Sequence, residues 1–269
     1  MIPAEFAYHR AESLDDAIEA LGRDPDAKLL AGGHSLIPAL RLRIARPSVL
    51  VDVGRLEDLR YVRDDGDRIA IGALTRHAQL AVDPVLGHGC AVVARAAALV
   101  GDPQVRHRGT IGGSVAHADP ASDLPTVLLA LDASLVARGP DGERTIPVSS
   151  FFIGPFTTAL AAREVLTEIR IPKVDRGVYL KHTRRAQDWA TVGVAAVVAD
   201  GTTHVALASM GPTPVRARAV EDALANGAGA AEAAARAGEG TEPPSDVSGS
   251  GEYRAHLAQV YVRRALEQL

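Results

Sequence analysis

The chain has 269 residues, of which 47% are hydrophobic and 23% charged, so it holds either one large globular domain or two smaller ones. A net charge of −4 provides no basic surplus for nucleic acid, and the single cysteine, Cys90, excludes an internal disulfide and any four-cysteine zinc or iron–sulfur site within the chain. The apolar stretches are too short to span a membrane and the start carries no export signal, so we expect a cytoplasmic protein.

The first predicted element is a helix over residues 14–21, because Ser13 and Asp16 form a capping pair and the apolar residues that follow share one face. The same patterns predict alternating strands and helices up to residue 171. The predicted strands are 28–31, 49–53 and 164–171, the hairpins are 60–72 and 134–148, and the other helices are 36–43, 76–82, 90–100 and 124–131.

Residues 101–123 interrupt this periodicity. They contain four glycines, two prolines, two histidines and three aspartates. A polar segment of this length inside a compact domain is usually a functional loop, and its short apolar centres indicate that it is ordered. We therefore predict an ordered functional loop here.

The pattern changes after Pro172. Three strands are predicted, followed by three helices, with a Gly/Pro/Ser-rich solvent loop at 238–251. The strands are 177–184, 191–199 and 202–209, and the helices are 216–225, 228–237 and 252–268. This order predicts a small α+β domain with a three-stranded antiparallel sheet, beginning near residues 172–176.

Two glycine pairs are candidates for ligand binding: Gly32-Gly33, followed by His34 and Ser35, and Gly112-Gly113, followed by Ser114. Glycine lets a backbone approach a ligand closely or adopt a positive φ, so that successive amides can converge on an anion. A diphosphate is long enough to use both loops. Two unrelated tight turns remain the alternative, since the usual Gly-x-Gly-x-x-Gly and Gly-Lys-Ser/Thr signatures are absent.

Taken with their surroundings, these motifs resemble a known family, the FAD-binding medium subunits of the molybdenum hydroxylases, which include the xanthine and carbon monoxide dehydrogenases. Within that family the chain is most similar to the carbon monoxide dehydrogenase type. The resemblance covers nearly the whole chain. It rests on KLLAGGHSLIP at 28–38, VRHRGTIGGSVAHADPASD at 105–123, EVLTEIRIP at 164–172 and YLKHTRRAQDWA at 179–190.

The resemblance implies an α+β fold. It has a two-part FAD-binding domain of the vanillyl-alcohol-oxidase (PCMH) type, followed by a small α+β C-terminal domain. The implied boundaries are 1–56 and 57–174 for the two FAD-binding subdomains and 175–269 for the flavoprotein C-terminal domain.

The resemblance also implies a set of FAD-binding residues, with no catalytic residue and no metal ligand in this chain. Asp123 would accept hydrogen bonds from hydroxyls on the flavin side, Lys181 would approach the polar edge of the ring, and Trp189 would shield one ring face. The full set is Leu30, Ala31, Gly32, Gly33, His34, Ser35, Leu36, Thr110, Ile111, Gly112, Gly113, Ser114, Asp123, Leu166, Lys181 and Trp189. The alternatives are a helix N-cap for Asp123, a solvated lysine for Lys181 and a core tryptophan for Trp189.

The function implied by the resemblance is electron transfer. FAD would take electrons from a small iron–sulfur subunit and pass them to a quinone, NAD or oxygen, while a large molybdopterin-binding subunit oxidises the substrate. The implied assembly is a dimer of heterotrimers. Two alternatives stay open: a stand-alone FAD-dependent oxidase or reductase of the same fold, and a non-catalytic scaffold subunit that has lost its flavin.

Overall fold

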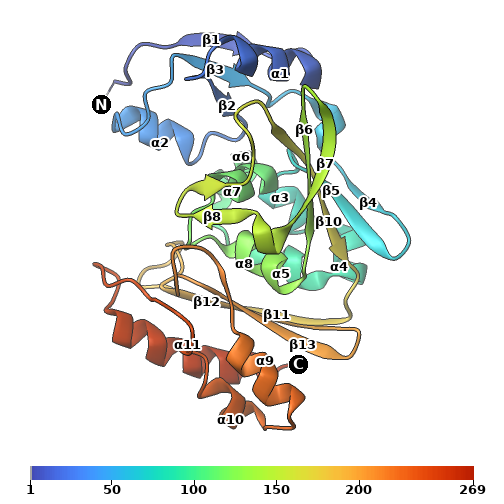
Figure 1. Cartoon of the computed structure of the whole chain (residues 1–269), viewed down its shortest axis with the longest axis vertical. Helices are drawn as coiled ribbons and strands as arrows, with labels where there is room; N and C mark the ends of the chain where they lie inside the picture. The colour runs from blue at the N-terminus through green and yellow to red at the C-terminus, as the bar shows by residue number, and fades with distance from the viewer. Residues whose placement is uncertain (1) are drawn as a thin grey trace.

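The structure, a computed structural model, describes residues 2–269. Three units follow one another along the long axis of the molecule, each built on its own sheet (Figure 1). The first and second units form the upper two thirds of the view, and the C-terminal sheet with its helices lies below them. No helix within residues 2–269 combines the length and the apolar character needed to cross a membrane.

The N-terminal unit is a three-stranded parallel sheet in the order β1-β3-β2, with α1 packed against it and α2 beside it. Its elements are β1 (Ala7–Arg10), α1 (Leu14–Arg23), β2 (Lys28–Leu30), α2 (Leu36–Arg41) and β3 (Val49–Asp52). The helix cap is confirmed, since Ser13 accepts a hydrogen bond from the Asp16 amide at 3.1 Å. Strand β1 was not predicted, because its largely exposed sequence Ala-Tyr-His-Arg has no apolar pattern and is ordered by pairing with β3.

The middle unit contains a five-stranded antiparallel sheet in the order β4-β5-β10-β6-β7. Both predicted hairpins are present, β4 (Val62–Asp64) with β5 (Arg68–Gly72) and β6 (Ser134–Gly139) with β7 (Gly142–Pro147). The remaining elements are η1 (Glu57–Leu59), α3 (His77–Leu80), α4 (Pro84–Gly89), α5 (Ala91–Ala98), α8 (Asp123–Ala130), η2 (Val148–Ser150), β8 (Phe152–Gly154), β9 (Thr157–Thr158) and β10 (Val165–Pro172).

The segment 101–123 is ordered, as we predicted, but it is not a loop throughout. It contains two short helices, α6 (Pro103–Arg108) and α7 (Ile111–His117). Each begins at a cap: the Asp102 side chain accepts from the Val105 amide, and the Thr110 hydroxyl accepts from the Gly113 amide. The segment is therefore helical because of its caps and the proline in the first turn of α6, which an analysis of apolar periodicity does not detect.

The C-terminal sheet has four strands, in the order β11-β12-β13-β14, and not the three that we predicted. The three predicted strands are present as β11 (Arg176–His182), β12 (Val192–Ala199) and β13 (Thr202–Ala208). The additional strand, β14 (Val215–Arg216), is only two residues long and pairs with Ala206 and Leu207 just before the next helix begins. The helices are α9 (Arg218–Ala225), α10 (Ala230–Ala234) and α11 (Gly251–Leu266).

Strand β12 is buried on both faces, and this joins the C-terminal unit to the middle one. Ala195 and Val197 belong to the same core as α5 and α8, whereas Val194 and Ala196 pack in the core formed with α9, α10 and α11. Successive residues of a strand point to opposite faces, so the odd-numbered side chains face the middle unit. A nearly continuous apolar sequence is what a strand covered on both faces requires.

We predict that Leu128→Ala lowers the free energy of unfolding by about 2–5 kcal/mol, because Leu128 on α8 is fully buried in the shared core and its truncation leaves a cavity. Leu42→Ala is the matched control, since Leu42 is 56% exposed, and we expect a change below about 0.5 kcal/mol. Urea unfolding followed by circular dichroism measures both. Equal effects of the two substitutions would contradict this account of the core.

Candidate functional site

The first glycine loop joins β2 to α2 and leaves a run of backbone amides free. Gly33 has a φ of 79°, which turns the chain at this point. Within residues 2–269, none of the amides from Gly32 to Leu36 donates a hydrogen bond to the protein. Successive free amides beside a left-handed glycine form a concave site for an anion such as a phosphate. This loop has the geometry that its sequence predicts.

The second glycine pair lies in the first turn of α7, and its amides are used within the protein. The Ile111 amide donates to the Thr75 carbonyl at 3.0 Å, the Gly112 amide to the Ala73 carbonyl at 2.8 Å, and the Gly113 amide to the Thr110 hydroxyl at 3.1 Å. Neither glycine has a positive φ. The expectation of successive free amides therefore holds for the first loop only.

Close packing explains the glycines of the second motif. A Cβ added at Gly112 would lie 2.6 Å from the Ala73 carbonyl oxygen, and one at Gly113 would lie 2.9 Å from the Thr110 hydroxyl. Both distances are shorter than normal contacts, so the small residue lets α7 lie directly against the neighbouring backbone. Thr110 and Ile111, which precede the pair, are buried, and Ser114 is half-buried.

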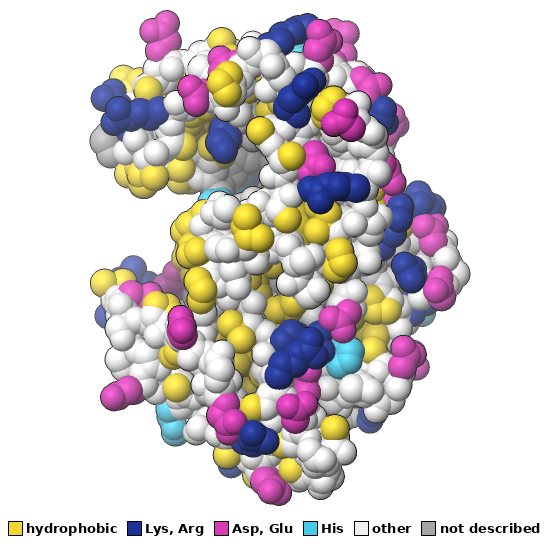
Figure 2. Space-filling model, in the orientation of Figure 1, with side chains coloured by type: hydrophobic (Ala, Val, Ile, Leu, Met, Phe, Trp, Pro, Cys, Tyr) yellow, Lys and Arg dark blue, Asp and Glu magenta, His cyan; other side chains and the backbone are white. Residues whose placement is uncertain are grey.

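The first glycine loop touches the backbone that leads into the second motif. A Cβ added at Gly32 would lie 2.2 Å from the Arg108 carbonyl oxygen and 2.8 Å from the Gly109 Cα. Backbone therefore packs directly on backbone where the N-terminal unit meets the segment that leads into the second motif. Figure 2 shows the surface hollowed between the lobe that carries α2 and the middle of the molecule. This contact places the first loop next to the start of the second motif, as a dinucleotide bound by both loops would require.

His77 packs against Gly109 at the contact between the first loop and the segment before the second motif. This role was not predicted from the sequence. It is buried at the start of α3, its backbone amide donates to the Gly109 carbonyl at 3.0 Å, and its ring lies against Gly109. Its Nδ1 has no partner within the described residues. Burial, with smaller contributions from Arg106 and His34, lowers the pKa of His77 to about 4, so the ring is neutral at pH 7.

Asp123 and Lys181 come together from different units. Asp123 is the first residue of α8, and its carboxylate accepts from the Lys181 ammonium at 3.0 Å, with each side chain 6% exposed. Lys181 also donates to the Leu99 carbonyl at 3.3 Å. Burial raises the pKa of Asp123, while Lys181 and the Tyr179 hydroxyl oppose that rise. Ser122 occupies the N-cap position, so Asp123 is not the helix cap and Lys181 is not a solvated lysine.

Leu166 and Trp189, the two remaining predicted site residues, lie outside the glycine loops and the Asp123–Lys181 pair. Leu166 is buried on β10, where the strand register shifts between Leu166 and Glu168. Trp189 is 55% exposed on the segment that joins β11 to β12, so it is not a core residue. An exposed indole can stack on a ligand ring.

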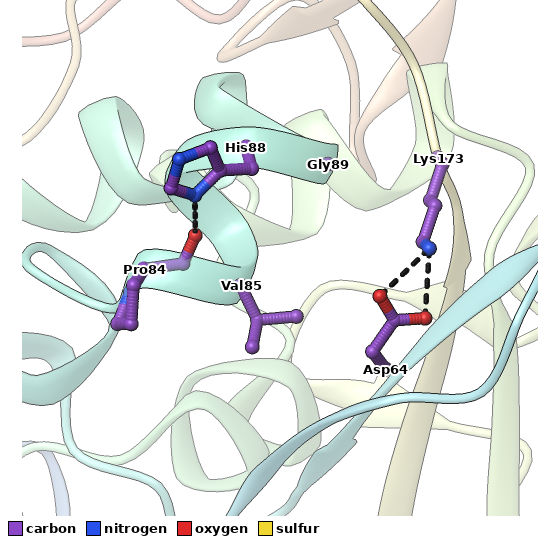
Figure 3. Close-up of a pocket in the computed structure, with 6 residues that line it drawn as sticks. All are labelled: Asp64, Pro84, Val85, His88, Gly89 and Lys173. Carbon is purple, nitrogen blue, oxygen red and sulfur yellow. Dashed lines mark hydrogen bonds and ion pairs between the residues drawn. The ribbon is translucent and has the colours of Figure 1, made fainter.

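A separate hollow of about 400 Å³ lies near α4, on the side of the molecule away from α2 and α7 (Figures 1 and 3). Its polar groups are already paired. Lys173 binds Asp64 with Nζ 2.7 Å from Oδ1, and the His88 ring contacts the Pro84 carbonyl of its own helix at 2.6 Å. With no free polar groups converging on it, this hollow does not have the features of a cofactor site.

The first glycine loop, Asp123 and Lys181 fit three polar parts of FAD. Free amides suit the diphosphate, a carboxylate suits hydroxyl donors, and an ammonium suits the carbonyl edge of a flavin ring. Residues 2–269 contain no group of three His, Cys, Asp or Glu side chains arranged to hold a metal ion.

We predict that Gly32→Val lowers the FAD content of the purified protein several-fold with little change in helix and strand content. The added side chain would collide with the Arg108 carbonyl and separate the two loops. Gly87→Ala is the control, because a Cβ at Gly87 meets no atom within 4 Å and the residue lies in α4. An unchanged flavin load in Gly32→Val would rule out the shared loop site.

We also predict that His77 makes the fold sensitive to acid. The unfolded chain takes up the His77 proton near pH 6.5, but the folded chain does so only near pH 4. Stability present above pH 6.5 is therefore lost as the pH falls toward 4, by roughly 3 kcal/mol at most. Urea unfolding at a series of pH values should show a shallower acid loss in His77→Leu than in the wild type. Parallel pH profiles for the two proteins would contradict the prediction.

Two family models together match nearly the whole chain. The model described as the FAD binding domain in molybdopterin dehydrogenase matches residues 4–174, and the model described as the CO dehydrogenase flavoprotein C-terminal domain matches residues 178–269.

Curated relatives and solved structures agree with these matches. The chain is 40% identical to the carbon monoxide dehydrogenase medium chain of Hydrogenophaga pseudoflava, over 99% of this chain and 97% of that one. It is 37% identical to the glyceraldehyde dehydrogenase medium chain of Sulfolobus acidocaldarius, over 100% of both. The structure of carbon monoxide dehydrogenase from Hydrogenophaga pseudoflava matches with a TM-score of 0.95 at 41% identity, covering 100% of this chain and 98% of that one. The resemblance and the fold class inferred from the sequence are thus confirmed, and the chain belongs to the family of FAD-binding subunits of molybdopterin dehydrogenases, with FAD as its cofactor.

Proposed function

We propose that this chain is the electron-transfer subunit of a molybdenum hydroxylase, and that the first glycine loop together with the Asp123–Lys181 pair holds its FAD. The observation that carries the proposal is the run of free amides from Gly32 to Leu36, which begins where Gly32 packs against the backbone of Arg108 and Gly109, just before the second glycine motif. Nothing within the described structure satisfies these donors, and an anion on the cofactor would.

The partners follow from what the chain lacks. One cysteine cannot hold iron–sulfur clusters, and the relatives are described as medium chains. Those relatives belong to enzymes named for different substrates, carbon monoxide and glyceraldehyde, yet they match this chain over its full length. A small iron–sulfur subunit and a large molybdopterin-binding subunit would therefore complete the enzyme, with the oxidised substrate bound by the large one. A cytoplasmic location and a dimer of heterotrimers stay predictions.

The FAD site draws on all three parts of the chain, which supports the division at 1–56, 57–174 and 175–269. The first glycine loop belongs to the first part, the second loop and Asp123 to the second, and Lys181 to the third. In the proposed site, Leu30, Ala31 and Gly32–Leu36 border the diphosphate on one side. Thr110, Ile111 and Gly112–Ser114 border it on the other. Because the amides of Ile111–Ser114 are already engaged, we assign the second motif to shaping the wall and the first to donating hydrogen bonds.

The Asp123–Lys181 pair has hydrogen-bonding capacity left for the flavin. An ammonium group has three protons, and Lys181 uses two of them, on Asp123 and Leu99. Each carboxylate oxygen of Asp123 accepts one hydrogen bond from the protein and can accept another. The free ammonium proton suits the carbonyl edge of the ring, and the free lone pairs suit hydroxyl groups of the flavin side chain.

FAD, when bound, supplies the redox chemistry, and the protein supplies binding, orientation and electrostatic tuning. Lys181 places a positive charge where reduction adds negative charge, which stabilises the reduced cofactor. Leu166 would provide an apolar wall beside the ring. Trp189, exposed between β11 and β12, would cover one ring face and have to move aside to admit an acceptor. The two alternatives, a stand-alone oxidase or reductase and a flavin-free scaffold, find no comparable support. A scaffold without flavin, in particular, has no use for a run of free amides.

We predict that the chain, purified through an affinity tag under native conditions, brings with it a large molybdenum-cofactor chain and a small iron–sulfur chain, and shows a flavin absorption spectrum. Mass spectrometry of the purified complex and its metal content measure the first expectation. A single colourless chain that FAD cannot reconstitute would refute the proposal. Turnover of an organic donor by the isolated chain would instead favour a stand-alone enzyme.

We predict that Lys181→Met makes the two-electron potential of the bound flavin more negative, because the charge that stabilises the reduced form is removed. If the reduced flavin loses about 1.4 kcal/mol of stabilisation, its two-electron potential falls by about 30 mV. Lys173→Met is a matched control, since it breaks a different lysine–aspartate pair, with Asp64, at the remote hollow. Redox titration of the flavin spectrum measures both variants. Equal potentials in the two would remove Lys181 from the proposed site.

A further inference from the structure

A buried tyrosine next to the Asp123–Lys181 pair has no role in the function proposed above. Tyr179 precedes Lys181 by two residues on β11, so both side chains point from the sheet toward α8. The Tyr179 hydroxyl donates to Asp123 Oδ1 at 2.6 Å, while the Lys181 ammonium donates to Oδ2 at 3.0 Å. The two donors therefore hold different oxygens of one carboxylate.

The neighbouring strand leaves space for this hydroxyl. Gly193 on β12 lies opposite Lys181 in the antiparallel ladder. A Cβ added at Gly193 would lie 2.6 Å from the Tyr179 hydroxyl oxygen and 3.1 Å from the Ala208 Cβ. Glycine weakens the interior of a strand, and here it is the residue that leaves room for the tyrosine. The position of the hydroxyl is thus built into two strands.

The ionisable groups that face Asp123 are only these two, among the described residues. The other charged side chains on elements packed against α8 are engaged elsewhere. His204 and Arg216 bond to Ala130 and Leu129 at the opposite end of the helix. Further away, Arg95 of α5 bonds to the Gly177 carbonyl and His117 of α7 lies against Phe156. Burial raises the pKa of Asp123, and Tyr179 and Lys181 are the two groups that oppose that rise.

We propose that Tyr179 is a positioning residue for FAD: its hydroxyl fixes the Asp123 carboxylate from the buried side, which leaves the remaining lone pairs of the carboxylate and the third ammonium proton of Lys181 for the flavin. This inference rests on the proposed placement of FAD at Asp123 and Lys181. Because Asp123 begins α8 and Tyr179 lies in the C-terminal sheet, the same hydrogen bond ties together the two units that contribute the pair.

The test is the affinity for FAD of the assembled complex, measured by removing the flavin and titrating FAD back at a series of pH values. In Tyr179→Phe we expect the dissociation constant at neutral pH to rise about tenfold or more, as for the loss of a hydrogen bond to a charged group. We also expect the loss of affinity in acid to begin at a higher pH, because a carboxylate without this donor takes up a proton more readily.

Tyr61→Phe is the matched control. It removes another tyrosine hydroxyl that donates to a carboxylate, that of the buried Glu168, at 2.5 Å. It should leave both the affinity for FAD and its pH profile as in the wild type. Gly193→Ala is a second, independent variant, because its methyl group displaces the Tyr179 hydroxyl without changing Asp123, Tyr179 or Lys181. It should reproduce the effect of Tyr179→Phe.

Asp123→Asn separates the two levels of the argument. If Tyr179 acts through Asp123, adding Tyr179→Phe to Asp123→Asn weakens FAD binding little further. If Tyr179→Phe and Gly193→Ala lower only the melting temperature, and leave the affinity and its pH profile equal to those of the control, Tyr179 is merely structural and the inference is wrong. If Asp123→Asn itself binds FAD as the wild type does, the proposed placement of FAD is wrong, and the positioning role fails with it.

Discussion

The arrangement of the site depends on one contact between two backbones, that of Gly32 and that of Arg108 and Gly109. A side chain as small as a methyl group at residue 32 would overlap the Arg108 carbonyl oxygen. Because the two segments meet without side chains between them, the free amides of the first loop lie beside the segment that leads into α7. The N-terminal sheet, with its parallel β1-β3-β2 order, delivers the first loop to this place, and the buried His77 ring supports the second from behind. The glycine content of the two motifs thus has two causes, a positive φ at Gly33 and backbone contact at Gly32 and Gly112.

The elements that the sequence predicts well are those with a local signal. The Ser13 cap, the two hairpins of the middle unit and the three long strands of the C-terminal sheet are all present, because caps, turn residues and apolar periodicity act over a few neighbours. The elements that it missed have no such local signal. Strand β1 is ordered by β3, and β14 has only two residues to pair with β13. The helices α6 and α7 are too short for apolar periodicity to show, and the structure is what identifies Asp102 and Thr110 as their caps.

At the proposed site, the sequence identifies candidate residues, but it does not show how each of them acts. The resemblance singled out Asp123 and Lys181 separately, and the structure joins them in one buried cluster with Tyr179. Asp123 on the helix is 56 residues from Tyr179 and 58 residues from Lys181 in the chain. The spacing of Tyr179 and Lys181 was a usable signal, since alternate residues of a strand share a face. Their common partner was not predictable, because it lies on another unit. Similarly, equal-looking glycine pairs proved to have different tasks once the partners of their amides were known.

The two-sided burial of β12 has a consequence for how the protein is assembled. Ala195 and Val197 complete a core whose other members come from the FAD-binding part of the chain, so the C-terminal segment is not an appendage that can be detached from a finished domain. Cutting the chain near residue 175 would expose an apolar helix surface on one fragment and an apolar sheet face on the other. The C-terminal segment therefore serves as a wall for its neighbour as well as carrying Lys181 of the proposed FAD site, which constrains how freely evolution can exchange this segment between related subunits.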